Sequence, residues 1–496
     1  MYDVVIDRLD HQGRGIGYIN GKIVFVKEAL VGESAKVKVI RENKKFYEGV
    51  VVDYFSKSSD RESVVCPYYN DCGGCDIMHM KYSFQHDYKV NKVRDIIRKF
   101  VHSDIIINDI GYDSQFYYRN KATFHVKDGI GYYKEKTYDL ISIDKCMICS
   151  LEINNTLDVL KKMDLSGIDS VVVRSSYFDK SVMVIFCVRG KVDEGYLINS
   201  LKDEVSSIYI KNDKYKLIYG SEYIIDMIGD KRFVISPDSF FQVNTPMAYK
   251  LYSKVLEYAG NLDNSNVLDL YCGTGTIGLF VGGKIIVGVE INESAIHDAN
   301  INKNLNEISN VKFYCGDSGK VLKRLDKNFD VVIVDPPRSG LSSLSIGEVI
   351  SVGAKRVVYV SCDPVTLARD LNIFKEYYDI KEISLFDMFP NTHHVETVVL
   401  LSQRKADDYV EVELELDELD LTSAESKATY KEIQEYVLKE HGLKVSNLYI
   451  SQVKRKCGIE VGENYNLPKS EDSRQPQCPE EKEKAIKDAL EHFGMV

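Results

Sequence analysis

Residues 269–278, DLYCGTGTIG, decide the fold. A glycine turn of the form G-x-G-x-x-G, from Gly273 to Gly278, directly follows a short apolar stretch. A strand, such a turn and a helix are typical of the first unit of a doubly wound α/β sheet, where a nucleotide-like cofactor lies at the carboxyl end of the strand. The turn alone does not identify the cofactor, and an NAD-dependent oxidoreductase stays open at this point.

Strands and helices alternate downstream of this turn. We expect strands at 266–271, 285–290, 311–315, 330–335, 356–361, 382–387 and 395–401. The alternation predicts a Rossmann-like α/β domain over residues 236–405. A helix is expected to begin upstream of the first strand at Thr245–Pro246, with Thr245 as the N-cap and proline at the first helical position.

Polar and reactive side chains stand where these strands end. Tyr271, Glu290, Asp335 and Cys362 each follow or end a predicted strand. Glu396 begins the last strand, which reaches the same edge of the sheet if it runs antiparallel. An acid after the second strand suits ribose hydroxyls in several cofactor classes. A cysteine and a second carboxylate beside a cofactor site favour covalent activation of an electrophilic ring over hydride transfer.

Uracil is such a ring. Its carbon 5 is a poor nucleophile, but a thiolate that adds at carbon 6 converts the ring to an enolate, and carbon 5 can then attack an activated methyl group. A general base must afterwards remove the carbon 5 proton so that the cysteine is eliminated. One cysteine and one carboxylate are therefore the minimum reactive parts.

Three further stretches carry a resemblance. They are DPPRSG (335–340) with VVYVSCDPVT (357–366), FDMFPNTHHVE (386–396) and FFQVNTP (240–246). With them, the chain resembles the RNA uracil-5-methyltransferase family, which makes 5-methyluridine in 23S rRNA and tRNA. The resemblance covers residues 1–403 and implies an S-adenosylmethionine-dependent enzyme that methylates a uridine in RNA. It favours 23S rRNA as the substrate, with tRNA as the alternative.

The resemblance also implies roles for single residues. Cys362 matches the nucleophile and Glu396 the base. The positions that hold S-adenosylmethionine or the substrate ring are matched by Gln242, Tyr271, Glu290 and Asp335. Asp317, after the third strand of this domain, is expected to contact the adenine edge of the cofactor. Phe240 is placed to stack on a base that is flipped out of its helix, since carbon 6 cannot be attacked within a stack.

A cysteine cluster, CPYYNDCGGC, spans residues 66–75. Its three cysteines, Cys66, Cys72 and Cys75, need a fourth ligand to complete a metal site, and Cys146 and Cys149 in ISIDKCMICS are the candidates. Spacing alone leaves a zinc site and a 4Fe–4S cluster open. The resemblance selects a 4Fe–4S cluster on Cys66, Cys72, Cys75 and Cys146, with a structural role because the reaction transfers no electrons.

Short strands between glycine turns fill residues 1–60 and predict a small closed β-barrel, which resembles the RNA-binding TRAM domain. Residues 61–235 are expected to form a central α+β iron–sulfur and RNA-binding domain. An acidic linker, 406–424, then leads to a small helical extension, 425–496, with helices near 428–440, 446–456 and 480–493. In outline the extension resembles a helix-turn-helix, and either an RNA contact or a small appended domain is consistent with it.

Composition limits the classes of protein to which the chain can belong. The 44% hydrophobic content is ordinary for a soluble protein, and we find no apolar run long enough to span a membrane and no signal peptide. We expect a cytoplasmic monomer whose partner is RNA, without a membrane or protein partner. A net charge of −11 does not exclude a local basic groove. A metal-stapled RNA-binding module without catalysis is the alternative from a different class.

Overall fold

The computed structural model describes residues 1–496 except 102–104, 326–327, 405–429, 458–477 and 494–496. It divides into two compact units, 1–408 and 409–496. In the described part of the chain, no helix combines the length and the apolar character that a membrane crossing requires.

The first unit begins with a six-stranded sheet of order β1-β5-β6-β4-β3-β2. Neighbouring strands in this sheet are antiparallel, except that β4 and β6 are parallel. The strands are β1 (Tyr2–Val5), β2 (Arg8–Leu9), β3 (Gly15–Ile19), β4 (Lys22–Lys27), β5 (Ser34–Glu42) and β6 (Phe46–Ser56). Alternate apolar residues, among them Val24, Val26 and Val37, make its core. The short strands are confirmed, and closure into a barrel stays a prediction.

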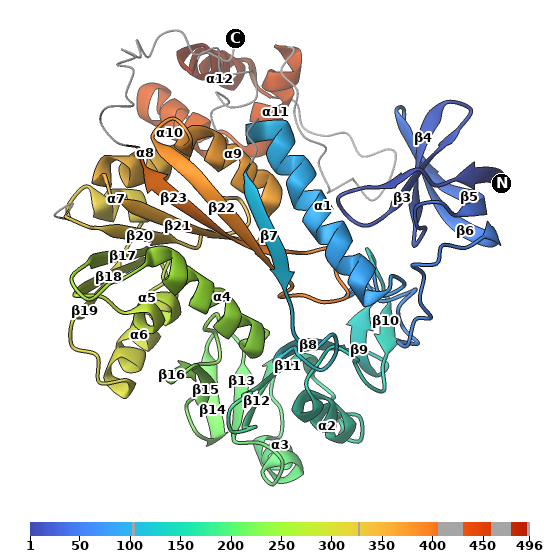
Figure 1. Ribbon diagram of the computed structural model, residues 1–496, viewed down its shortest axis with the longest axis horizontal. Coiled ribbons are helices and arrows are strands. Elements are labelled where there is room, and N and C mark those ends of the chain that lie inside the picture. Colours follow the sequence, from blue (N-terminus) through green and yellow to red (C-terminus); the bar gives the residue numbers. More distant parts are fainter. Residues whose placement is uncertain (102–104, 326–327, 405–429, 458–477, 494–496) are drawn as a thin grey trace. The chain divides into compact units, whose positions relative to one another are not determined.

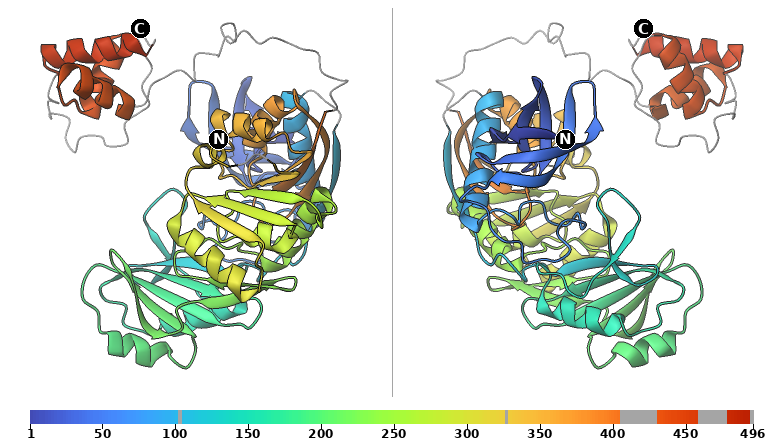
Figure 2. Two further views of the ribbon diagram at one scale, coloured as in Figure 1. Left: turned by 90° about the vertical axis from the view of Figure 1, so that its left-hand side faces the viewer. Right: turned by 90° about the vertical axis from the view of Figure 1, so that its right-hand side faces the viewer.

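A seven-stranded sheet of order β10-β9-β8-β11-β12-β13-β14 follows. Its strands are β8 (Lys121–Val126), β9 (Ile130–Tyr133), β10 (Leu140–Ser142), β11 (Ile168–Ser175), β12 (Val182–Val188), β13 (Ser207–Lys211) and β14 (Tyr215–Gly220). The helices α2 (Leu151–Leu160) and α3 (Glu194–Leu201) contribute to its core. This sheet runs from cyan to green in Figure 2. A hairpin of β15 (Ile224–Ile228) and β16 (Lys231–Ile235) leads to the α/β part.

The α/β part is an eight-stranded sheet of order β19-β18-β17-β20-β21-β23-β22-β7. Its strands are β17 (Asn266–Leu270), β18 (Ile285–Glu290), β19 (Val311–Cys315), β20 (Val331–Val334), β21 (Arg356–Ser361), β22 (Tyr378–Phe386), β23 (Glu396–Gln403) and β7 (Ile106–Gly111). Only β23 runs antiparallel to its neighbours within the sheet. The seven strands predicted after residue 260 and the reversed direction of the last one are therefore confirmed.

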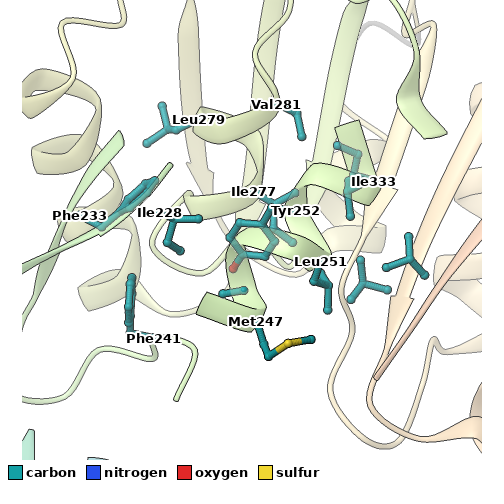
Figure 3. Packing of buried hydrophobic residues seen from close by; sticks show 14 of the residues in the cluster. Ile228, Phe233, Phe241, Met247, Leu251, Tyr252, Ile277, Leu279, Val281 and Ile333 are labelled. Carbon is teal, nitrogen blue, oxygen red and sulfur yellow. The ribbon is translucent and has the colours of Figure 1, made fainter. Parts of the chain in front are cut away.

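Helices cover both faces of this sheet. One face packs against α4 (Thr245–Ala259) and α5 (Thr276–Val281), and Figure 3 shows Tyr252 of α4 amid Ile277 of α5 and its apolar neighbours. The helix α6 (Glu293–Leu305) contacts β18 and β19. The other face packs against α1 (Tyr82–Val101), α7 (Ser318–Leu322), α8 (Ser343–Val352) and α9 (Pro364–Phe374).

Two sequence predictions are wrong in detail. Residues 82–111 were expected in the central domain, but β7 pairs with β22 and α1 contacts α9, so both belong to the α/β part of the chain. Figure 1 shows β7 in blue beside β22 in orange. The N-cap of α4 is Asn244 rather than Thr245, because the Asn244 side chain accepts the Met247 amide and Thr245 is already helical.

The second unit contains α10 (Tyr430–His441), α11 (Asn447–Lys456) and α12 (Glu480–His492). Its core includes Ile433, Ile450 and Ile486, one from each helix. The three predicted helices are confirmed over the described residues, and the predicted acidic linker of residues 406–424 lies outside them. Lys454 is buried and Lys456 forms an ion pair with Glu483, so this part of the basic end of α11 is engaged within the unit.

The buried face of α1 changes character along its length. Gln85, Lys89, Val93, Ile97 and Val101 recur every fourth residue and are all buried. The last three enter the apolar core under the sheet. Lys89 instead places its ammonium 2.6 Å from Asp387, in the loop after β22, with both side chains fully buried.

Removal of the Lys89 charge tests this contact. Because Lys89→Met leaves Asp387 buried without its cation, we expect a loss of about 3–5 kcal/mol in the free energy of unfolding. Arg98→Met, at the exposed end of the same helix, should change it by less than about 1 kcal/mol. Urea unfolding followed by circular dichroism measures both, since the chain has no tryptophan. Equal losses in the two variants would contradict a stabilising role for the buried pair.

Candidate active site

The pairing of two strands builds the site. Ser361, the last residue of β21, lies opposite Thr397 of the antiparallel β23. Cys362 therefore leaves β21 at the edge of the sheet where Glu396 begins β23. The parallel strands β17, β18 and β20 end at the same edge, so Tyr271, Glu290 and Asp335 are brought there as well.

The glycine turn lies at the centre of this edge. Tyr271 has a φ of +62°, and Gly273 and Gly275 have φ values of +52° and +77°. The amide of Gly278 donates to Asp269 Oδ2 at 2.8 Å, and a Cβ added there would lie 2.8 Å from the same oxygen. Gly278 thus allows close packing of α5 against β17, while the earlier glycines supply left-handed backbone for the tight turn.

The residues expected around a cofactor have definite neighbours. Glu290 is half-buried and accepts the amides of Gly273 and Asn292 at 3.2 and 2.9 Å. The hydroxyl of Tyr271 lies 3.2 Å from Ser345 Oγ. Asp317 is exposed and accepts the Lys320 amide at the start of α7, so a cap is the contact that the structure gives it.

Three acidic groups share the buried part of the site. Burial raises the pKa of Glu396 to about 8, and the charge of Asp335 adds to this shift while Arg338 opposes it. Burial raises the pKa of Asp335 to about 7. Burial also raises the pKa of the Cys362 thiol to about 12, with further increases from the charges of Glu396 and Asp335. At neutral pH the free site therefore favours a protonated thiol and a protonated Glu396, which is a stronger base than an ordinary carboxylate once it is ionised.

Arg338, the arginine of DPPRSG, is not among the site residues that the sequence predicted. Its charge lowers the pKa of both Cys362 and Glu396. Arg338 is therefore the cation whose charge affects the pKa of both groups. A single arginine directly after the proline pair was the signal available in the sequence.

The segment with Phe240 and Gln242 is tied to the seven-stranded sheet. Arg174 of β11 is buried and donates to the carbonyls of Ser236 and Ser239 at 2.7 and 2.8 Å. Asn120 donates to the carbonyl of Gln242 at 2.9 Å. The Gln242 side chain hydrogen-bonds the hydroxyl of Tyr252.

Phe240 is 66% exposed in this segment. Its ring is therefore accessible, and its stacking on a flipped base stays a prediction.

The four predicted cysteine ligands line one cavity of about 690 Å³. Cys66, Cys72 and Cys75 come from one loop and Cys146 from the loop after β10. Cys149 does not line this cavity: it is buried and lies 3.5 Å from the Tyr132 hydroxyl. Within the described ranges, no three or more histidine, cysteine, aspartate or glutamate side chains are arranged to hold a metal ion. The 4Fe–4S cluster stays a prediction.

Comparison with known families gives two matches. Residues 81–404 match the family described as tRNA (Uracil-5-)-methyltransferase. Residues 1–52 match the TRAM domain.

Similar proteins cover most of the chain. An uncharacterized RNA methyltransferase of Clostridium acetobutylicum is 36% identical over 445 residues, which are 81% of this chain and 97% of that protein. One from Bacillus cereus is 36% identical over 442 residues, 81% of this chain and 96% of the relative. Among solved structures, the Pyrococcus abyssi tRNA (uracil-54, C5)-methyltransferase in complex with S-adenosyl-L-homocysteine is 28% identical, with a TM-score of 0.67 over 81% of this chain and 100% of that one.

The raised pKa of Cys362 predicts slow alkylation. Below its pKa the thiolate fraction grows about tenfold with each pH unit, so the rate of Cys362 labelling by iodoacetamide should rise by that factor through the neutral and mildly alkaline range. Mass spectrometry of the peptide with Cys362 measures this rate, and the exposed Cys315 serves as the internal reference. A plateau of the Cys362 rate near neutral pH would contradict the predicted ionisation.

Proposed function

Since the chain belongs to the tRNA (uracil-5-)-methyltransferase family, we propose that it transfers a methyl group from S-adenosylmethionine to carbon 5 of a uridine in RNA through a covalent Cys362 adduct. The observation that carries the proposal is the juxtaposition of Cys362 and Glu396 across the β21–β23 pair. An NAD-dependent oxidoreductase would have no use for this pair.

The reaction follows from the roles of two side chains. The Cys362 thiol gives its proton to water, and the thiolate sulfur then forms a bond to carbon 6 of the uracil while the electron pair of the carbon 5–carbon 6 double bond moves onto the ring as an enolate. S-adenosylmethionine supplies an electrophilic methyl group, which carbon 5 accepts as S-adenosylhomocysteine leaves. Glu396 then takes the carbon 5 proton, the carbon 6–sulfur bond breaks, and Cys362 is regenerated.

Charge in the site suits this order of events. The pKa of about 8 makes Glu396 a stronger base than an ordinary carboxylate once it is ionised. The high pKa of Cys362 keeps the thiol protonated until substrate binds. Arg338 opposes both shifts, and it is the group we assign to stabilising the thiolate when the uracil enters.

We assign S-adenosylmethionine to the edge beside the glycine turn. Glu290 at the end of β18 takes the ribose hydroxyls, as acids do at this position of doubly wound sheets. Tyr271 and Gln242 contact the cofactor or the ring, and Asp335 takes the polar edge of the uracil. Asp317 takes the adenine edge, where its exposed carboxylate is open to solvent. The solved relative that holds S-adenosyl-L-homocysteine supports a cofactor of this class.

We propose 23S rRNA as the substrate. The four-cysteine set supports this choice, because the resemblance associates these cysteines with the rRNA enzymes. The Pyrococcus abyssi relative favours tRNA instead, since that enzyme is a tRNA (uracil-54, C5)-methyltransferase. Transfer of labelled methyl groups to unmodified transcripts of both RNAs separates the two candidates. Transfer to neither would leave the RNA-binding module without catalysis as the alternative.

The N-terminal sheet and the seven-stranded sheet are proposed to contact the RNA. The match of residues 1–52 to the TRAM domain supports the first contact. The cavity beside the cysteine loop supports the second, because Arg119, Lys121 and the exposed Phe240 line it together. Cations and aromatic rings are the groups that bind phosphates and unstacked bases.

A change of the base should separate methyl transfer from product release. In Glu396→Gln the adduct can form and be methylated, but the carbon 5 proton stays, so methylated RNA should accumulate bound to protein. We expect release to fall by about 10²–10⁴-fold. SDS gel electrophoresis with methyl-labelled S-adenosylmethionine measures bound and free label. Glu376→Gln, on the exposed surface, is the control and should release RNA normally. Normal release by Glu396→Gln would rule out its role as the base.

We further propose that Cys66, Cys72, Cys75 and Cys146 hold a 4Fe–4S cluster. Four thiols fit the donor set of such a cluster or of zinc, and all four line one cavity. The cluster would join the loop of residues 66–75 to the loop after β10, and the methyl-transfer steps do not pass through it.

Two cysteine variants test the ligand set. Cys146→Ser in anaerobically purified protein should lose iron and sulfide, while Cys149→Ser should keep both because Cys149 lies outside the cavity. Elemental analysis and visible absorbance measure the content. Loss of iron in Cys149→Ser alone would reverse the assignment, and stoichiometric zinc without sulfide would replace the cluster by a zinc site.

A further inference from the structure

The loop of residues 387–395 carries the proposed base into place, because Glu396 follows it directly. Side chains from distant segments bind its backbone carbonyls. Asn244 donates to Met388 at 3.2 Å, Lys89 to Phe389 at 3.1 Å, Tyr118 to Pro390 at 3.0 Å and Lys92 to His393 at 2.8 Å. Fixed partners along successive carbonyls leave this loop few alternative conformations.

Asn391 lies at the centre of these contacts. It is fully buried and has a φ of +67°, in the left-handed region that asparagine tolerates better than other residues with a side chain. The backbone amide of Asn391 donates to Gln85 Oε1 of α1 at 3.0 Å. Its side-chain oxygen accepts from Gln85 and Gln115 at 3.3 and 2.8 Å, and its side-chain nitrogen donates to the Gln115 carbonyl at 3.0 Å.

The carbonyl of Asn391 connects the loop to the cysteine segment. It accepts the amides of Asp76 and Ile77 at 3.0 and 3.1 Å, directly after Cys75. His393 adds a contact of 2.7 Å between its ring nitrogen and the Asp76 carboxylate. Asn391 therefore forms hydrogen bonds with α1, with the loop before β8 and with the cysteine segment, and it lies on the backbone that leads to Glu396.

We infer that Asn391 is a positioning residue for Glu396, which sets the proton-abstraction step by holding the loop of residues 387–395 in one conformation. The inference rests on the proposed function, in which Glu396 is the base. Asparagine combines tolerance of the left-handed backbone with a short side-chain amide whose oxygen accepts and whose nitrogen donates at this point. Because Asn391 does not touch Cys362, adduct formation and methyl transfer do not depend on it.

The test separates the two halves of the reaction in Asn391→Gly. Glycine adopts the same φ without strain but removes the side-chain contacts with Gln85 and Gln115. In single turnovers with methyl-labelled S-adenosylmethionine and substrate RNA, adduct formation should stay within about threefold of the wild type. Release of methylated RNA should slow by about 10–100-fold, since misplacement of a reacting group by about 1 Å has that effect. The methylated adduct should then accumulate, as in Glu396→Gln.

Two further variants keep the outcome decisive. Gln115→Ala removes one contact to the Asn391 side chain and should slow release by a smaller factor, in the same direction. Glu307→Gly, at an exposed left-handed position with a φ of +55°, is the matched control and should behave as the wild type.

Three outcomes overturn the inference. Wild-type release by Asn391→Gly would show that the loop needs no such contact. An equal loss of adduct formation and release would show a general structural role. If the wild type itself forms no adduct and transfers no methyl group to RNA, the proposed function fails first, and this result differs from both of the others.

Discussion

The pairing of β21 with an antiparallel β23 is the constraint on which the rest of the site depends. In a sheet of parallel strands only, the residue after one strand and the first residue of another lie at opposite edges. Reversal of β23 places Glu396 beside the exit of β21, where Cys362 stands. A nucleophile and a base from positions 34 apart in the sequence thereby share one edge with the glycine turn. This arrangement is what separates the chain from a dinucleotide-binding enzyme with the same turn.

Burial then sets the chemistry of these groups. Cys362, Asp335 and Glu396 are shielded from water. Negative charge on Asp335 raises the pKa of Glu396, and negative charge on either carboxylate raises the pKa of Cys362. The site consequently favours neutral groups before substrate arrives, with Arg338 as the countercharge for the ionised forms. A base that holds its proton more tightly than an ordinary carboxylate is suited to accept one from a ring carbon.

Sequence patterns predicted the strands and their carboxyl ends well, because apolar runs and glycine turns are local signals. They missed that β7 and α1 belong to the α/β part, since the pairing of β7 with β22 joins residues about 275 positions apart and leaves no local mark. The contacts of Asn391 and Arg174 were missed for the same reason. Lys89, one turn before the apolar residues Val93, Ile97 and Val101 on the same face of α1, was a readable signal for a buried carboxylate partner. The cysteine pattern predicted ligands that share a cavity but could not select the metal.

The most direct measurement of the central claim is the site of the covalent adduct. RNA with 5-fluorouridine at the target position cannot lose a proton from carbon 5, so the methylated adduct should persist through proteolysis. Mass spectrometry should find the modified nucleotide on the peptide that contains Cys362, and Cys362→Ala should yield no adduct. An adduct on another cysteine, or methyl transfer by Cys362→Ala, would contradict the account.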